Sequence, residues 1–342
     1  MLLSDDRTPD GPLPDRPVVF FGGKGGVGKT TLAATAALDL ARRGHRTLLV
    51  STDPAHSTGD ILQTELGPVP RPVVADCWAM ELDPEREADR YIEEVKERIA
   101  SAAPPRLLAE AERQIDIARV SPGAVEAALF ERFARILEEE GAEFDRIVFD
   151  TAPTGQTLRL LSLPELMTTW MTGLIQRRKK VSALARMWRN VAGSARGETE
   201  HDDPVLEALV ERRGRFHRAR QTLTDPKRTA FVFVVIPERL PIWETEKAVE
   251  TLSRHGIPVG AIVVNQVLPD ALPEEGGAPF LEGRRTREAG YLARISRNLG
   301  DWPVLCVRIQ ESDPVGVDAL KELGAGIRPA PPEWNRRTEE SR

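Results

Sequence analysis

A lysine and two threonines follow a run of glycines near the start of the chain, at the spacing that binds nucleotide phosphates. The pattern G-x-x-x-x-G-K-[ST] runs from Gly23 to Thr30. Glycines let the backbone curl until several N–H groups point at one anion. We expect Lys29 to reach the β- and γ-phosphates of ATP and the Thr30 hydroxyl to ligate Mg²⁺. The nucleotide-binding residues expected here are Gly23, Lys24, Gly25, Gly26, Val27, Gly28, Lys29, Thr30 and Thr31.

The flanking segments are those that such a loop requires. The apolar run Val18–Phe21 precedes it and is typical of a buried strand. The Ala- and Leu-rich segment Thr31–Arg43 follows it and ends before Gly44, as a helix would. The partial positive charge of that helix N-terminus favours a phosphate at the same place.

Two aspartates follow two further apolar strands. Asp53 comes after the strand 46–51, and Asp150 ends the strand 144–150. The carboxyl ends of parallel strands line the ligand crevice, so Asp53 could orient an attacking water or contact the Mg²⁺ shell. Asp53 could equally cap the turn before Pro54. An apolar strand that ends in Asp is the Walker B arrangement, which places Asp150 near Mg²⁺.

Later strands are predicted at 229–236, 261–264 and 304–309. Asn265 follows the second of them, where its amide could hydrogen-bond an adenine edge or simply belong to a turn. Strands that alternate with helices favour an α/β fold, with a doubly wound, mostly parallel sheet of the P-loop NTPase type.

Two helical insertions are expected to interrupt this fold, at about 84–140 and 166–226. The second contains apolar residues at helical spacing, among them Met167, Trp170, Met171 and Met187. This stripe could be a plastic binding surface or the seam of a helical subdomain. The expected domain therefore covers 17–328, with polar, disordered tails at 1–16 and 329–342.

The composition of the chain limits the kinds of partner and metal site that we expect. The chain has 342 residues and a formal net charge of −6, so no global basic field attracts nucleic acid. It has no apolar run long enough to span a membrane, and we expect a cytoplasmic protein. The two cysteines, Cys77 and Cys306, form no C-x-x-C pattern. Each lies in an apolar run that is more typical of a core than of a metal site.

Four stretches together resemble one family. Residues 22–31, 51–57, 150–161 and 263–266 are similar to the arsenical-pump ATPase (ArsA) family, which includes the eukaryotic targeting factor for tail-anchored membrane proteins. The loop Gly-Lys-Gly-Gly-Val-Gly-Lys-Thr also resembles the deviant Walker A class. The resemblance implies an ATP-driven homodimer, whose helical subdomain moves with nucleotide state.

The resemblance also implies roles for single residues. Lys24 would reach across the dimer to the partner's nucleotide, and Asp53 would position the attacking water. Asp150 would lie near Mg²⁺, while Asn265, Asp313 and Pro314 would lie near the adenine.

The chain departs from the family pattern in several places. Gln156 stands where the family motif commonly has His, which puts any histidine role there in doubt. The zinc-bridging C-x-x-C of the targeting factor and the cysteine triad that binds arsenite in the pump ATPase are both missing. Only one phosphate loop is present, whereas the well-known pump ATPase carries two.

These features favour an ATPase that captures or targets a hydrophobic or membrane-protein client. The alternative within the family is the ATPase subunit of an arsenite or antimonite efflux pump, acting with a membrane transporter. A MinD- or ParA-like positioning switch is the alternative of another class. It would need a basic DNA-binding face or a terminal amphipathic helix, and residues 333–342 supply neither.

Overall fold

The computed structural model describes residues 11–53, 57–102, 113, 124–151, 172–173, 175–176, 204–269, 278–332 and 334. The chain divides into two compact units. The first comprises residues 1–83, 141–158 and 223–342, and the second comprises 84–140 and 159–222. The residues of the second unit overlap the insertions expected at 84–140 and 166–226. The stripe residues Met167, Trp170, Met171 and Met187 lie outside the described residues, as does Gln156.

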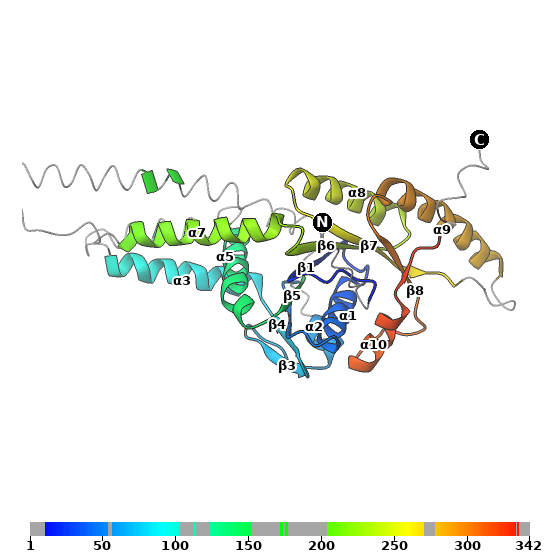
Figure 1. Cartoon of the computed structure of the whole chain (residues 1–342), viewed down its shortest axis with the longest axis horizontal. Coiled ribbons are helices and arrows are strands. Elements are labelled where there is room, and N and C mark those ends of the chain that lie inside the picture. The colour runs from blue at the N-terminus through cyan, green and yellow to red at the C-terminus, as the bar shows by residue number, and fades with distance from the viewer. Residues whose placement is uncertain are drawn as a thin grey trace, which may run out of the picture. The chain divides into compact units, whose positions relative to one another are not determined.

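The first unit is built on a nine-stranded sheet in the order β3-β4-β2-β5-β1-β6-β7-β8-β9 (Figure 1). The sheet is parallel except at its two edges, where β3 and β9 run antiparallel to their neighbours. The strands are β1 Val18–Gly22, β2 Thr47–Ser51, β3 Arg71–Val74, β4 Cys77–Glu81, β5 Arg146–Asp150, β6 Thr229–Val235, β7 Val259–Val267, β8 Val304–Arg308 and β9 Arg328–Pro329. This is the doubly wound α/β fold expected from the sequence.

Helices cover both faces of the sheet, with α1 and α10 on one face and α8 and α9 on the other (Figure 1). Val19 and Phe21 of β1 point to the α1 face and belong to one apolar core with Leu32 and Leu320. Phe20 points to the other face, where its ring stacks on Phe149 and Phe231 at centroid distances of 4.9 and 5.8 Å. Because both faces are covered, the central strands are apolar along their whole length. The helices of this unit are α1 Lys29–Arg42, α2 Ser57–Leu62, α8 Arg239–Arg254, α9 Ala278–Leu299 and α10 Val317–Gly326, with the 3-10 turn η1 at Glu140–Ala142 beside the unit boundary.

Ordered structure extends further toward both ends than the sequence predicts. Leu13 is buried in the core, and Asp15 pairs with Arg146 at 2.5 Å. An apolar side chain within a polar, Pro-rich segment is thus enough to hold residues 11–16 against the sheet. At the other end, β9 pairs Pro329 with Leu305 of β8.

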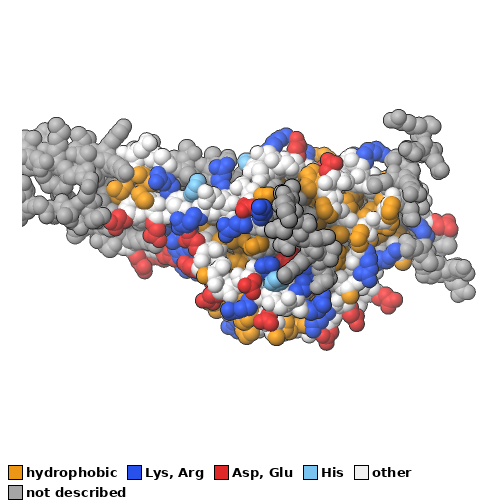
Figure 2. All heavy atoms as spheres, viewed as in Figure 1, with side chains coloured by type: hydrophobic (Ala, Val, Ile, Leu, Met, Phe, Trp, Pro, Cys, Tyr) orange, Lys and Arg blue, Asp and Glu red, His pale blue; other side chains and the backbone are white. Residues whose placement is uncertain are grey.

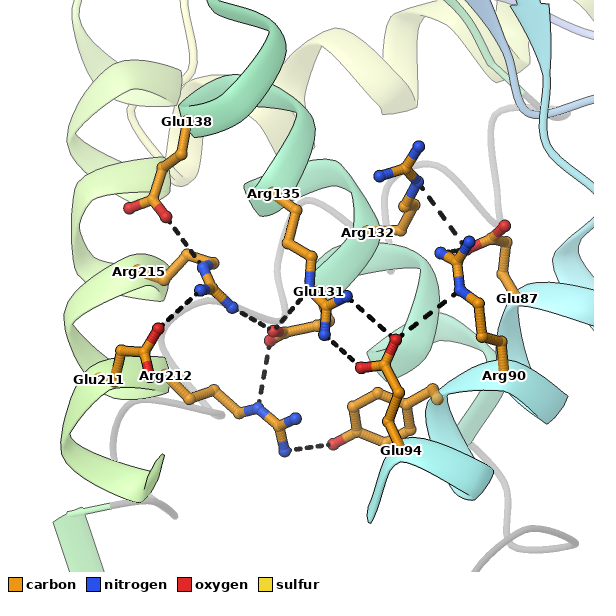
Figure 3. A network of polar contacts seen from close by, with 11 residues as sticks. Glu87, Arg90, Glu94, Glu131, Arg132, Arg135, Glu138, Glu211, Arg212 and Arg215 are labelled. Carbon is orange, nitrogen blue, oxygen red and sulfur yellow. Dashed lines mark hydrogen bonds and ion pairs between the residues drawn. The ribbon is translucent and has the colours of Figure 1, made fainter. Parts of the chain in front are cut away.

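The second unit contains α3 Pro84–Ala102, α5 Ala124–Glu139 and most of α7 Pro204–Thr224. Phe130, Phe133 and Phe216 form an aromatic cluster between α5 and α7. Beside this cluster, arginines and glutamates from all three helices form a network of ion pairs, centred on Glu131 (Figure 3).

Among the helices that the structure describes, none is long and apolar enough to cross a membrane. On the face drawn in Figure 2, basic and acidic side chains of the described residues are interspersed. That distribution fits the negative net charge of the whole chain and does not favour a nucleic-acid partner on this face.

Candidate nucleotide site

The glycine-rich loop joins the central strand β1 to the buried helix α1. Gly28 has a φ of 90°, and a Cβ at this position would lie 2.4 Å from Nδ2 of Asn265. A Cβ at Gly23, where φ is 155°, would lie 2.3 Å from the carbonyl oxygen of Val234 in β6. Both positions therefore require glycine, for conformation and for space.

Lys29 begins α1 and is almost completely buried, with 4% of its side chain exposed. Its ammonium lies 3.9 Å from Oδ2 of Asp53, whose side chain is 15% exposed. A buried ammonium without an anion is costly, and this separation is long for an ion pair. Two carboxylates, Asp53 and the buried Asp150, act on this ammonium at the loop where a phosphate would bind.

Asp150 ends β5, directly beside the loop, and its carboxyl is completely buried. The Ser51 hydroxyl donates to Oδ2 at 3.3 Å, whereas the described residues provide no hydrogen-bond partner for Oδ1. Burial raises the pKa of Asp150 to about 6, and the nearby Thr30 hydroxyl and Lys29 ammonium oppose that rise.

The donor set around Asp150 fits Mg²⁺. A buried carboxylate oxygen without a partner is an unsatisfied acceptor, and Mg²⁺ prefers oxygen ligands of this kind. The Thr30 hydroxyl belongs to the first turn of α1. It accepts a hydrogen bond of 3.5 Å from the hydroxyl of Ser57, the first residue of α2. Asp150 and Thr30 are thus the residues that would hold the ion.

Lys29, Thr30, Asp53 and Ser57 line one cleft of about 630 Å³, large enough for a nucleotide, whereas the completely buried Asp150 is not among its lining residues. Among the expected residues, the cleft is lined by Gly25, Gly26, Gly28, Lys29, Thr30, Thr31, Asp53, Asn265, Asp313 and Pro314. Residues from the loop, from the end of β7 and from the segment after β8 thus share one cavity, although they lie more than 200 positions apart in the sequence.

Besides Asp150, three expected residues do not line the cleft. Gly23 and Val27 pack beneath the loop, and Val27 is buried in the core of the α1 face. Lys24 is not among the described residues that line the cleft. Its ammonium lies 3.6 Å from Oε1 of Glu244 in α8.

Asn265 contacts the loop itself. Its Nδ2 donates to the Val27 carbonyl at 2.9 Å, and its Oδ1 accepts from the Gln266 N–H at 2.9 Å. Part of the hydrogen-bonding capacity of the amide therefore fixes the phosphate loop, and the remainder faces the cleft. The sequence suggested a contact with adenine or a place in a turn, and did not indicate the hydrogen bond to the loop.

The cleft wall also includes residues that the sequence did not assign to the site, among them Gln266, Arg308, Ile309 and Gln310. The ends of β7 and β8 supply them, at the edge where ligands bind in such sheets. Their place at the ends of two strands was the one feature of the sequence that could have indicated a role in the site. Residues 54–56 and 152–160, which follow Asp53 and Asp150 in the two aspartate motifs, lie outside the described part of the chain.

A glycine loop between a central parallel strand and a buried helix, with aspartates at the ends of neighbouring strands, defines a P-loop NTPase. The model of the anion-transporting ATPase (ArsA) family matches residues 16–328. The chain belongs to this family and is an ATPase.

Three curated relatives illustrate the range of names in this family. A putative arsenical pump-driving ATPase 2 of Aquifex aeolicus is 33% identical, over 90% of this chain and 97% of the relative. An ATPase ASNA1 homolog 1 of Paramecium tetraurelia is 31% identical, over 89% of this chain and 90% of the relative. A putative arsenical pump-driving ATPase of Halobacterium salinarum is 34% identical over 92% of this chain, but this chain spans only 45% of that relative.

Proposed function

We propose that this ATPase is a Mg²⁺-dependent, cytoplasmic, dimeric switch that couples ATP binding and hydrolysis to the capture or targeting of a hydrophobic or membrane-protein client. The observation that carries the catalytic part is the cleft lined by Lys29, Thr30 and Asp53, with the buried carboxyl of Asp150 close to Lys29 and Thr30. The client part rests on the family resemblance and on the two cysteines, whose placement does not suit arsenite.

The residues of the cleft divide the work of hydrolysis. The loop N–H groups and the N-terminus of α1 bind the phosphates, and Lys29 neutralises the charge that develops on them. Asp53 accepts a hydrogen bond from the attacking water and orients it toward the γ-phosphate. Asp150 and Thr30 would hold a Mg²⁺ ion, which would supply positive charge to the phosphates.

The arsenical-pump alternative draws on the names of several relatives, but the thiols of this chain do not support it. As(III) prefers thiolate ligands. Cys77 is buried, and burial raises the pKa of its thiol to about 12. Cys306 lies on β8, and five strands separate β8 from β4, which carries Cys77. At roughly 4.8 Å per strand, the two cysteines of one chain lie about 29 Å apart across the sheet.

The test is ATP turnover by the purified protein. We expect Mg²⁺-dependent hydrolysis, with Lys29→Ala and Asp53→Asn each lowering kcat by about 10² to 10³, because each removes a positioned contact to the transition state. Unchanged turnover in both variants would contradict the site.

Two measurements distinguish a membrane-protein client from a metalloid. A hydrophobic transmembrane segment presented in detergent should bind in a way that depends on ATP, whereas arsenite and antimonite should leave turnover unchanged. Stimulation by either metalloid, lost in the Cys77→Ser/Cys306→Ser double variant, would favour the pump instead.

A further inference from the structure

The loop lysine that does not enter the cleft is held by an acidic partner. The Lys24 ammonium lies 3.6 Å from Oε1 of Glu244, and each side chain is 33% exposed. Lys24 belongs to the same loop as Lys29, yet Lys29 points into the cleft and Lys24 points toward α8. One loop thus presents one cation to its own nucleotide and another to the surface.

Glu244 is held at a defined place because α8 is fixed to α9. Two residues further along α8, Glu246 accepts hydrogen bonds from Arg294 at 2.9 and 2.5 Å and from Asn298 at 2.8 Å. The loop is fixed to the same region, since Gly23 packs against the carbonyl of Val234 just before α8. The Lys24–Glu244 pair therefore joins two firmly placed elements.

We propose that Glu244 is a positioning residue that regulates dimer formation by holding Lys24 in its own protomer. The inference rests on the proposed function, in which Lys24 acts on the nucleotide of a second copy. The Glu244 carboxylate then competes with the partner's phosphates for the same ammonium. The ion pair must break before the composite site forms, so Glu244 sets the protein concentration at which dimers assemble.

The size of the effect follows from the exposure of the pair. Ion pairs between partly exposed side chains are weak and screened by salt. Removing the Glu244 charge should therefore lower the protein concentration at half-maximal dimerisation by about two- to fivefold. The shift should shrink at high salt, because the competing interaction is itself an exposed ion pair.

The experiment measures dimerisation by sedimentation velocity, with a non-hydrolysable ATP analogue and Mg²⁺, for the wild type and Glu244→Gln. Glu250→Gln is the matched control, because Glu250 lies on the exposed surface of the same helix and pairs with Arg254 one turn further along it. We expect Glu244→Gln to shift the midpoint down and Glu250→Gln to leave it unchanged. In a Lys24→Ala background, Glu244→Gln should lose its effect.

The kinetic readout separates positioning from a change in the cleft. Activity per chain should rise at lower protein concentration in Glu244→Gln, with the KM for ATP unchanged at saturating protein. A midpoint that stays or rises in Glu244→Gln, or an equal shift in the Lys24→Ala background, would overturn this inference alone. A wild type that stays monomeric with the analogue would remove the proposed dimeric function as well.

Discussion

Asp150 combines a chemical role with a cost to stability. Its carboxyl is completely buried at the end of β5, and burial raises its pKa from the usual 3.8 to about 6. A raised pKa means that the folded state holds the proton more tightly than the unfolded state. Stability is then fully present below about pH 4 and is lost as the pH rises through about 6. A cation bound by this carboxylate, as we propose, would offset this loss.

Replacing Asp150 should therefore separate stability from activity. At pH 8, without nucleotide or metal, Asp150→Asn should melt a few degrees higher than the wild type, since each unit of pKa shift corresponds to about 1.4 kcal/mol. Thermal melts from pH 8 to pH 4.5 should show the difference shrinking as the wild-type carboxyl takes up its proton. ATP turnover of the variant should fall by about 10².

Asp301→Asn provides the control, because Asp301 is an exposed aspartate on the loop before β8. It should change neither the melting temperature nor turnover beyond small surface effects. A lower melting temperature for Asp150→Asn at pH 8 would show that the ionised carboxylate stabilises the fold even without a metal.

At the residue scale, the sequence indicated the groups whose types carry the chemistry. Lys29 and Thr30 stand in the phosphate-loop pattern and Asp150 ends an apolar strand, whereas the role of Asp53 came from the family resemblance. The hydrogen bond from Asn265 to the loop depends on how β7 packs beside β1 and β6, and no local pattern encodes that distance. The ion pair between Lys24 and Glu244 could not be predicted, because it joins two elements whose proximity only the folded structure gives.

At the scale of elements, the predicted strands were those buried on both faces. The apolar runs at 18–21, 46–51, 144–150, 229–236, 261–264 and 304–309 correspond to β1, β2, β5, β6, β7 and β8. The edge strand β3 is partly exposed and contains Pro72, and β9 has two residues. Neither has the apolar run on which the prediction depends.

The sequence did not predict the ion-pair network of the helical unit, because mixed charges along a helix are typical of a solvent-exposed surface. Glu131 is nevertheless only 3% exposed, and arginines from two helices surround it. Arg215 donates to it at 2.6 Å, while Arg212 and Arg135 approach to 3.3 and 3.5 Å (Figure 3). A carboxylate in this position compensates positive charge that water reaches poorly.

Removing the Glu131 charge should destabilise the helical unit by about 2–3 kcal/mol, because it leaves largely buried guanidinium groups without their anion. The measurement is urea unfolding of Glu131→Gln followed by circular dichroism. Glu211→Gln is the matched control, since Glu211 also pairs with Arg215 but is 66% exposed. We expect Glu211→Gln to cost less than about 0.5 kcal/mol, and equal losses in the two variants would contradict a buried role for Glu131.

At the scale of the whole molecule, the proposed dimer gives the two lysines of the loop different roles. Lys29 lies in its own cleft and Lys24 lies outside its own cleft. In a two-fold symmetric dimer, each nucleotide would then meet Lys29 and Asp53 of one chain and Lys24 of the other. Each composite site would therefore fail if either contribution were missing.

Mixing two inactive variants tests this arrangement directly. Lys24→Ala chains keep Asp53, and Asp53→Asn chains keep Lys24, so a mixed dimer has one site with both residues intact and one with neither. Random pairing of equal amounts makes half of the dimers mixed, and about a quarter of wild-type turnover should return. Each variant alone should stay near background, and Lys29→Ala mixed with Asp53→Asn should not recover, because both of those residues act in the same cleft. If sedimentation with differently labelled chains shows mixed dimers and turnover still does not return, Lys24 acts only within its own chain, and the pair with Glu244 would then be an ordinary surface contact.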